Sequence, residues 1–452
     1  MKRIVTICWF SCLVIAARAQ EASPTQVPAQ LSYKEALKIA IKNNVTLNQE
    51  KNNLELSEGV RANRIAQLAP TINGTLTASR IHGNFFNNNE GQVMNGVTDQ
   101  MNGSIDANMM LFNSFNRIYT IRQSSDLLRA QTSLVKRTEQ QVISDVSSQY
   151  LQVLLDQELM KIAERNIELL KAQLDQIKGQ VELGAKAEVD GITQDALVKG
   201  AELAFLRARV TLRNDKALLS QTMLIDAAAD FALEDPQWDA NFMASLDQDL
   251  NHLYAMAIAN REDYKQSLYT ENAALNFVRA SRGAYYPNLA AFAWYGSAYN
   301  KLRGTDVVSF RDQFYDDNTK FQYGLQLSIP IFNNLNNRLS MQRQRVAYNN
   351  AQLAKSNIEN KVKIDVQRAY LNFQDAIAAY QAAEVQLHAA EMSYNLETER
   401  YNLGITDLVQ YTQSNQNYVK AQGDFAQAKF TISFQKILLD FAVGTLKLED
   451  IP

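Results

Sequence analysis

Proline placement limits what this chain can fold into more than any other feature. The chain has seven prolines, yet none lies between Pro70 and Pro236, and none between Pro330 and Pro452. Proline interrupts helix interiors because it lacks a backbone N–H and clashes with the preceding turn. Each proline-free stretch can therefore hold helices far longer than those of an ordinary globular domain.

The two stretches also repeat each other. VISDV at 142–146 recurs as VKIDV at 362–366, LFN at 111–113 as IFN at 331–333, and Leu183-Gly184 as Leu403-Gly404. Each pair is separated by 220 residues (362 − 142, 331 − 111, 403 − 183). A fixed offset of this kind indicates a tandem duplication. We expect one repeat over residues 32–229, a linker over 230–249, a second repeat over 250–446 and a short tail over 447–452.

The first residues have the pattern of a secretory signal. Lys2 and Arg3 precede an apolar run over 4–16, and an Ala-Arg-Ala cleavage site follows at 17–19. We expect a signal peptide over 1–19 and an N-terminal extension over 20–31. Both cysteines, Cys8 and Cys12, lie inside the run. The mature chain would then have no disulfide, no thiolate metal site and no cysteine nucleophile.

The charge of the mature chain argues against a nucleic-acid partner. Removing the three basic residues of the signal leaves 42 basic residues (45 − 3) against 48 acidic ones, a net charge of about −6. Binding to nucleic acid requires a basic face. Beyond the signal, no apolar segment is long enough to form a transmembrane helix.

Between the helical stretches the hydrophobic pattern changes to a period of two, which predicts strands with one apolar and one polar face. Over 321–331 the odd positions are Phe321, Tyr323, Leu325, Leu327, Ile329 and Ile331, and the even ones are Gln322, Gly324, Gln326, Ser328 and Pro330. Residues 71–79 and 104–111 alternate similarly, and 286–299 is rich in aromatic and small residues. We expect each repeat to contribute one hairpin with strands of about ten residues, joined by long polar loops at 82–100 and 300–319. These lengths suit an outer-membrane barrel; a soluble four-stranded sheet packed on the helices is the alternative.

The predicted helices differ in length in a regular way. Residues 113–182 and 333–402 form two helices of 70 residues each (182 − 113 + 1 and 402 − 333 + 1), which would be about 105 Å long. The flanking helices, expected over 32–69, 185–226, 250–286 and 405–443, are about half as long. Two short helices placed end to end match one long helix, so we expect a bundle with Val142, Val146, Val153 and Leu154 in its seam.

Short motifs mark both ends of the long helices. The turns Leu183-Gly184-Ala185-Lys186 and Leu403-Gly404-Ile405-Thr406 place glycine where a helix ends in a left-handed residue. At the other end, Pro70, Phe112, Pro287 and Phe332 stand where helix and strand meet. Proline is tolerated at the first residue of a strand, and aromatic residues are typical of a membrane interface.

No pattern in the sequence indicates an enzyme. The three histidines, His82, His252 and His388, have no metal-ligand spacing, and no glycine-rich phosphate loop is present. Asp145 and Asp365 recur at the repeat offset, and we expect them to orient neighbouring basic residues such as Arg368. We therefore predict a protein with no catalytic activity, cofactor or metal.

The duplicated order of helix, hairpin, long helix, Leu-Gly turn and return helix resembles the TolC-like outer-membrane efflux proteins. The resemblance covers about residues 31–446, and the 230–249 linker is similar to that family's equatorial insert. It implies a homotrimer whose three chains give four strands each to one 12-stranded barrel in the outer membrane of a Gram-negative bacterium, continued by a helical tunnel in the periplasm. Four strands cannot close a barrel alone, and an open edge is prohibited in lipid.

The function that this resemblance implies is a passive outer-membrane channel of a tripartite efflux or type I secretion system. A periplasmic adaptor and an inner-membrane pump of the RND or ABC type would open it, and the adaptor would dock at the turns Leu183, Gly184, Ala185, Leu403, Gly404, Ile405 and Thr406. Outer-membrane lipid would be a further partner. A porin-like channel would not need such long helices. A periplasmic coiled-coil scaffold would not need the alternating strands.

The resemblance also suggests where the tunnel narrows. Asp190 lies six residues after Gly184, and Gln410 and Gln413 lie six and nine residues after Gly404. Members of the family place acidic side chains here, whereas the second repeat has glutamines. We expect a hydrogen bond between Tyr401 and Asp190 to hold this end closed; the alternative is that Tyr401 packs into the helix seam.

Overall fold

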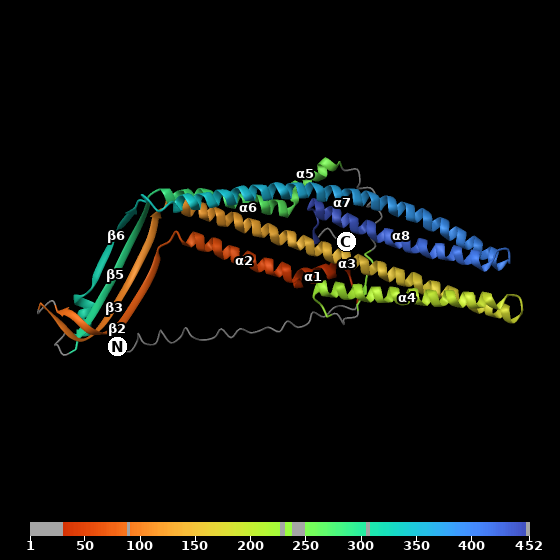
Figure 1. Cartoon of the computed structure of the whole chain (residues 1–452), viewed down its shortest axis with the longest axis horizontal. Helices are drawn as coiled ribbons and strands as arrows, with labels where there is room; N and C mark the ends of the chain where they lie inside the picture. Colours follow the sequence, from red (N-terminus) through yellow and green to blue (C-terminus); the bar gives the residue numbers. More distant parts are fainter. Residues whose placement is uncertain (1–29, 88–90, 227–230, 237–248, 304–307, 449–452) are drawn as a thin grey trace.

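The chain forms an elongated molecule with a β-sheet at one end and two helical hairpin tips at the other (Figure 1). The computed structural model describes residues 30–87, 91–226, 231–236, 249–303 and 308–448. The predicted signal peptide, with Cys8 and Cys12, lies outside the described residues, as does most of the 230–249 linker. Among the described helices, none is both long and apolar enough to span a bilayer.

Two helices run nearly the whole length of the helical part. They are α3 (Asn116–Glu182) and α7 (Asn336–Asn402), each of 67 residues and about 100 Å long. Each begins three residues later than predicted, because the chain turns from strand to helix through two consecutive left-handed residues. Ser114 and Phe115 have φ of 55° and 64°, and Asn334 and Leu335 repeat these values. Asparagine tolerates this conformation better than most residues, but phenylalanine and leucine do not, so propensity did not reveal these turns.

In the part of the chain that the structure describes, six shorter α-helices accompany the long ones. They are α1 (Tyr33–Asn43), α2 (Val45–Ala66), α4 (Glu188–Met223), α5 (Leu250–Asn260), α6 (Glu262–Arg282) and α8 (Leu408–Val443). The expected single helices over 32–69 and 250–286 are in fact broken at Asn44 and Arg261, whose ψ angles of 124° and 122° are not helical. As predicted, α3 packs along α2 and α4, and α7 along α6 and α8; α3 also contacts α6 and α8.

The sheet has four antiparallel strands in the order β2-β3-β5-β6. They are β2 (Thr71–Asn87), β3 (Gln92–Phe112), β5 (Asn288–Leu302) and β6 (Lys320–Ser328). The polar loop predicted over 82–100 was wrong, because the β2–β3 ladder continues to the pair Asn87 and Gln92. Backbone hydrogen bonds between strands do not require apolar side chains. The ladder therefore continues past the point where the apolar–polar alternation stops, and the strand ends predicted from that alternation were too early.

The second hairpin also differs in detail from the prediction. β5 extends to Leu302, and the segment expected as a loop contains a π-helical turn, η3 (Asp312–Asp317). β6 stops at Ser328 instead of Ile331, and Pro330 in the missing part has no N–H to donate to a ladder. A short 3-10 turn, η2 (Gly283–Tyr285), precedes β5.

The strand register gives the sheet one apolar and one polar face. Ile72 lies opposite Ala107, Ala107 opposite Ala293, and Ala293 opposite Tyr323. The adjacent row on the other face comprises Asn73, Asp106, Trp294 and Gln322. Because residues opposite each other point to the same side, the alternation in the sequence carries over to the whole sheet. The apolar face is exposed in the single chain at Ile72, Ile105, Tyr323, Leu325 and Leu327.

The densest core lies near the middle of the helical part. The predicted seam residues Val142, Val146, Val153 and Leu154 are all buried there. A two-stranded parallel sheet, β1 (Gln30–Leu31) with β4 (Ala232–Leu233), closes over them. The Tyr150 hydroxyl of α3 lies 2.7 Å from the Glu234 carbonyl and 3.0 Å from that of Leu31. This contact fastens the linker between the repeats to a long helix.

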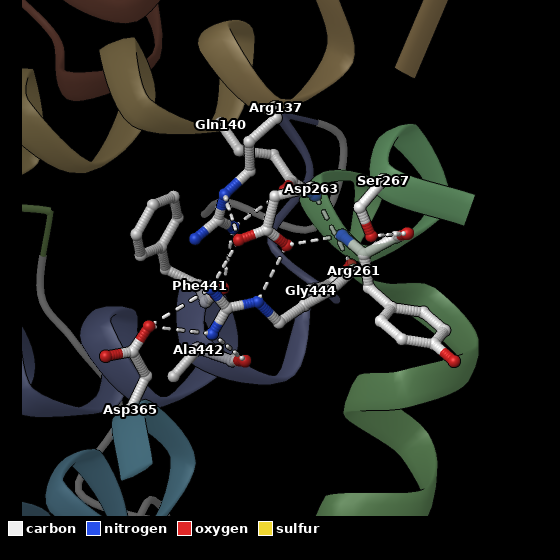
Figure 2. A network of polar contacts seen from close by, with 10 residues as sticks. Arg137, Gln140, Arg261, Asp263, Ser267, Asp365, Phe441, Ala442 and Gly444 are labelled. Atoms are coloured by element: carbon white, nitrogen blue, oxygen red, sulfur yellow. Dashed lines mark hydrogen bonds and ion pairs between the residues drawn. The ribbon is translucent and has the colours of Figure 1, made fainter. Parts of the chain in front are cut away.

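A buried arginine, Arg261, connects the helices of the second repeat to one another (Figure 2). Arg261, only 1% exposed, stands at the break between α5 and α6. Its guanidinium donates to Asp263 at 2.9 and 2.6 Å, to Asp365 of α7 at 3.1 Å and to the Ala442 carbonyl of α8 at 3.4 Å. Asp365 thus pairs with Arg261 and not, as expected, with Arg368. Moving any one of these helices would leave the buried guanidinium without some of its partners, which is energetically costly. Arg261 therefore holds the helices of the repeat in place.

Helix α3 of the first repeat reaches the same network. Arg137 donates to the Phe441 carbonyl at 3.1 Å, and its guanidinium lies 3.7 Å from the centre of the Phe441 ring (Figure 2). Burial lowers the pKa of Arg137 to about 10, against the opposing effect of Asp263. The two repeats are therefore bound to each other through α3 and α8.

Among the described residues, the buried carboxyl group of Asp156 in the first repeat forms no ion pair. Asp156 of α3 is 3% exposed, and its Oδ1 accepts from Gln152 Nε2 at 3.0 Å. Burial, and then the neighbouring carboxyl of Asp215 on α4, raises the pKa of Asp156 from 3.8 to about 7. At low pH the folded chain keeps this proton, whereas the unfolded chain loses it above pH 3.8.

The folded state should therefore lose stability as the pH rises from about 4 to 7, since only the unfolded state releases the proton in that window. We expect a loss of about 1 to 3 kcal/mol, less than the full shift implies because water reaches Asp215. Asp156→Asn should flatten this part of the profile and raise the melting temperature at pH 7.5. Asp175→Asn, at an exposed position of the same helix, is the control. An unchanged profile in Asp156→Asn would contradict the assignment.

Candidate functional site

The two Leu-Gly turns have the same backbone geometry. Gly184 and Gly404 have φ of 72° and 69°, the left-handed region that glycine adopts without strain. The Gly184 N–H donates to the Val181 carbonyl at 2.9 Å, and the Ala185 N–H donates to that of Gln180 at 2.8 Å. Gly404 and Ile405 repeat this pair of bonds at 3.1 and 2.8 Å. These are the bonds of a Schellman motif, so the predicted glycine caps are confirmed.

Each tip presents apolar side chains to the surroundings. Leu183 is 86% exposed and Leu403 is 74% exposed. The neighbouring exposed residues are Val189, Ile192, Ile405 and Val409. Single exposed apolar residues are common on any protein, but a group of them on one rigid end indicates a contact surface.

The tips of the two repeats touch through a lysine that the sequence analysis did not assign. Lys186 Nζ donates to the Tyr401 hydroxyl and lies 4.0 Å from the centre of the Tyr401 ring. The expected bond from Tyr401 to Asp190 is not formed; the hydroxyl is bonded to Lys186. Ile177 of α3 packs with Tyr401 in the same cluster. In the repeat alignment Thr406 stands opposite Lys186. This difference between the repeats was the sequence signal that could have pointed to a specific role for Lys186.

Tyr401 is also the first member of a row of tyrosines between α7 and α8. Its ring centre lies 5.1 Å from that of Tyr411, and the Tyr411 and Tyr394 hydroxyls are 3.3 Å apart. The rings of Tyr394 and Tyr418 stack at 5.2 Å. The alternative expectation, that Tyr401 packs into the helix seam, is thus confirmed. Its hydroxyl is bonded to Lys186 at the same time.

The glutamines of the second repeat lie on the exposed side of α8. Asp407 caps α8 by accepting from the Gln410 N–H at 2.8 Å, and Gln413 Nε2 donates to Asn417 at 3.1 Å. Asp190 lies in the first turn of α4 and is partly exposed. In the single chain none of these three side chains is buried.

The junction residues stand next to the ends of the strands. Pro70 and Pro287 directly precede β2 and β5, as expected for strand starts. Phe112 is the last residue of β3, and its ring packs edge-on against Phe115 at 5.6 Å. Phe332 lies beyond the end of β6 and is exposed.

The four-stranded sheet has β2 and β6 as its edge strands. Among the described strands, β2 and β6 each have one neighbour in the ladder, which leaves a row of backbone donors and acceptors on the outer side of each strand. In the part of the chain that the structure describes, no histidines and carboxylates gather into a metal-binding group.

This fold is that of solved outer-membrane channels. The channel OprN superimposes with a TM-score of 0.77 at 14% identity, covering 92% of this chain and 90% of OprN. VceC of Vibrio cholerae superimposes with a TM-score of 0.77 at 12% identity, covering 91% and 96%. At such low identity the likeness defines the fold.

The sequence defines the family. The profile of the outer membrane efflux proteins matches residues 36–223 and 253–445, and the chain belongs to this family. It is 22% identical to the outer membrane efflux protein BepC of Brucella suis over 98% of this chain and 92% of BepC. It is 21% identical to TtgC of Pseudomonas putida, a probable efflux pump outer membrane protein, over 79% of this chain and 71% of TtgC.

If the Lys186–Tyr401 contact holds the tips together, Tyr401→Phe should raise single-channel conductance in planar bilayers. The change removes a hydrogen bond from a charged donor, worth about 1.5 to 3 kcal/mol, while keeping the ring. Lys186→Met should act in the same direction. Tyr418→Phe, at the far end of the tyrosine row, should leave conductance unchanged. Equal conductance in all four proteins would show that this contact does not restrict the opening.

Proposed function

We propose that this chain is the outer-membrane channel of a tripartite efflux or type I secretion system, acting as a trimer that forms a passive conduit from the periplasm to the exterior. One observation carries the proposal: a sheet with an apolar face and two unpaired edges is joined end-on to helices of about 100 Å. The relatives named above come from Brucella suis and Pseudomonas putida and are named as outer-membrane efflux proteins. This supports the outer membrane of a Gram-negative bacterium as the location.

The height of the apolar face fits a membrane. Apolar rows run from Leu289 opposite Leu327 to Met101 opposite Tyr299. These rows span ten residues of β5 (299 − 289), or about 34 Å along the strand. Strands of membrane barrels tilt by about 35–45°, which reduces this span to about 25 Å, the height of the apolar band of an outer-membrane barrel.

The two lateral edges of the molecule consist of different elements. Association of unlike edges favours a closed ring of copies. One edge consists of β2, α2 and α4, and the other of β6 and α7. Both carry exposed large apolar side chains along the helices: Leu56, Val60, Leu206 and Val210 on the first edge, and Leu353, Leu371, Val385 and Leu396 on the second. Joining unlike edges head to tail by rotation gives a closed ring. With three chains, the ring has 12 strands.

The tips support a docking role. The groups around Leu183 and Leu403 lie at the end farthest from the sheet (Figure 1), where a periplasmic adaptor would reach them. We place adaptor docking at Leu183, Gly184, Ala185, Leu403, Gly404, Ile405 and Thr406. Asp190, Tyr401, Gln410 and Gln413 would line the narrow periplasmic opening. An inner-membrane pump, of the RND or ABC type, would supply the energy.

The purified mature chain should be a trimer in detergent, because a closed wall requires strands from three copies. Light scattering corrected for bound detergent should give three times the mass of one chain. A folded, monodisperse monomer would contradict the proposed architecture.

A bulky residue at Gly404 should abolish transport without affecting assembly. A Cβ at this position meets no heavy atom within 4 Å, so Gly404→Trp adds volume to the tip and the strain of a positive φ. Gly404→Ala brings that strain with little volume and is the control. We expect dye efflux to be lost in Gly404→Trp and mostly kept in Gly404→Ala, with both proteins trimeric. Normal efflux in Gly404→Trp would rule out docking at this turn.

A further inference from the structure

A short aromatic segment folds back onto the apolar face of the sheet. The segment over 308–318 contains η3, and three of its residues form hydrogen bonds with β5. Ser297 Oγ donates to the Phe314 carbonyl at 2.5 Å, and Asn318 Nδ2 donates to that of Ala298 at 2.7 Å. Gln313 accepts from the Asn300 N–H at 3.1 Å and donates to the Asn300 carbonyl at 3.2 Å. These bonds fix the segment at one level of the strands.

The aromatic rings of the segment form a layer at that level. Phe310 stacks on Phe314 at 5.2 Å and contacts Tyr299 edge-on at 5.1 Å, and Phe314 contacts Tyr315 at 5.5 Å. Phe314 covers Gly103, where a Cβ would lie 2.9 Å from its ring. Gly103 lies opposite Leu76, so the layer is on the apolar face. Aromatic girdles of this kind mark the level where lipid tails meet headgroups.

A basic cluster follows immediately beyond the aromatic layer. Arg80 lies opposite Asp99, and Asp99 opposite Lys301, one row beyond Ala78, Met101 and Tyr299 on the same face. Arg80 binds Asp99 with two hydrogen bonds of 2.5 and 3.1 Å. Arg303 Nε lies 3.8 Å from the same carboxylate. We name Arg80, Lys301 and Arg303 the basic cluster.

The basic cluster has more positive charge than its acidic partner can neutralise. Its three cations surround one carboxylate, and the side chains of Arg80 and Arg303 remain 50% and 56% exposed. Asp312 stands next to Gln313, which is bonded to Asn300 beside Lys301, but its carboxylate accepts from Ser309 Oγ at 2.7 Å. Asp316 and Asp317 precede Asn318, which is bonded to Ala298, three residues and about 10 Å before Lys301. Among the described residues, the ion pairs of Arg80 and Arg303 are with Asp99.

We propose that the basic cluster binds the phosphate groups of an anionic glycolipid in the outer leaflet, with the aromatic layer packed against the adjoining acyl chains. The proposal rests on the proposed function, which places the sheet in the outer membrane with the helices on the periplasmic side. The apolar rows end where the cluster begins, so the cations lie at headgroup depth. Guanidinium groups bind phosphate in a bidentate manner, and each cation near an anionic lipid surface strengthens binding about fivefold.

The test uses the full mature chain in nonionic detergent, with fluorescent lipid A carrying two phosphates as the probe. The triple variant Arg80→Gln, Lys301→Gln, Arg303→Gln should bind about a hundredfold more weakly than the wild type. Dephosphorylated lipid A should bind the wild type as weakly as the phosphorylated lipid binds the triple variant. Asp99→Asn should instead bind several-fold more tightly, because it removes the carboxylate that, among the described residues, pairs with Arg80 and Arg303. A merely structural role of the Arg80–Asp99 pair would weaken binding in both variants.

Lys161→Gln, Lys171→Gln, Lys199→Gln removes three charges from the helices and should leave lipid binding unchanged. Equal binding by the basic-cluster variant and the wild type would overturn the proposal, as would displacement of the lipid by millimolar inorganic phosphate, which would indicate a simple anion site. Trimer mass and bilayer conductance are measured on the same samples. A conducting wild-type trimer that does not bind lipid A refutes only the lipid site. A wild type that forms no trimer refutes the proposed function and the lipid site with it.

Discussion

The structure depends on two unpaired strand edges. Within the described residues, β2 and β6 each leave a row of backbone N–H and C=O groups without a ladder partner. In water these groups could be hydrated, but the same sheet carries an apolar face as high as a membrane, and lipid offers no hydrogen bonds. In the proposed function the edges pair with those of another copy, and the long helices extend the same ring of chains beyond the membrane.

The duplication supplies a regular framework, and its departures from symmetry supply the specific contacts. The Schellman turns, the left-handed pairs before α3 and α7, and the 67-residue helices all repeat. The side-chain contacts of Asp365 in the middle of the helical part and of Lys186 at the tips do not repeat. Asp365 binds Arg261, whereas its counterpart Asp145 accepts only from Gln141 among the side-chain bonds of the described residues. At the tips, Lys186 of one repeat meets Tyr401 of the other. The Arg261–Asp365 and Lys186–Tyr401 contacts thus lie where the two copies have diverged.

Sequence reasoning was most successful where a long pattern was available. The presence and approximate length of the long helices follow from the proline-free stretches and the repeat, and the faces of the strands follow from alternation over many residues. It was less successful where a single backbone feature decides, as at Ser114 and Phe115, or where polar residues continue a ladder, as in β2 beyond His82. The breaks at Asn44 and Arg261 carry no proline or glycine. Among the site residues, the glycine turns could be located from spacing. The partner of Tyr401 could not, because Lys186 comes from the other repeat and only the folded chain brings the two together.

Closure between chains is the central claim, and disulfide cross-linking tests it most directly. Within one chain β2 and β6 are separated by two strands, or about 14 Å, which no disulfide can bridge. Single cysteines at Asn73, Thr75 or Thr77 of β2, combined with one at Gln322, Gly324 or Gln326 of β6, would be oxidised in membranes. Asp106→Cys with Trp294→Cys, a pair within one chain, verifies that oxidation works. We predict that at least one β2–β6 combination gives covalent dimers and trimers on a non-reducing gel. If the control pair forms its bond and every β2–β6 combination stays monomeric, the chain does not close its barrel in this way.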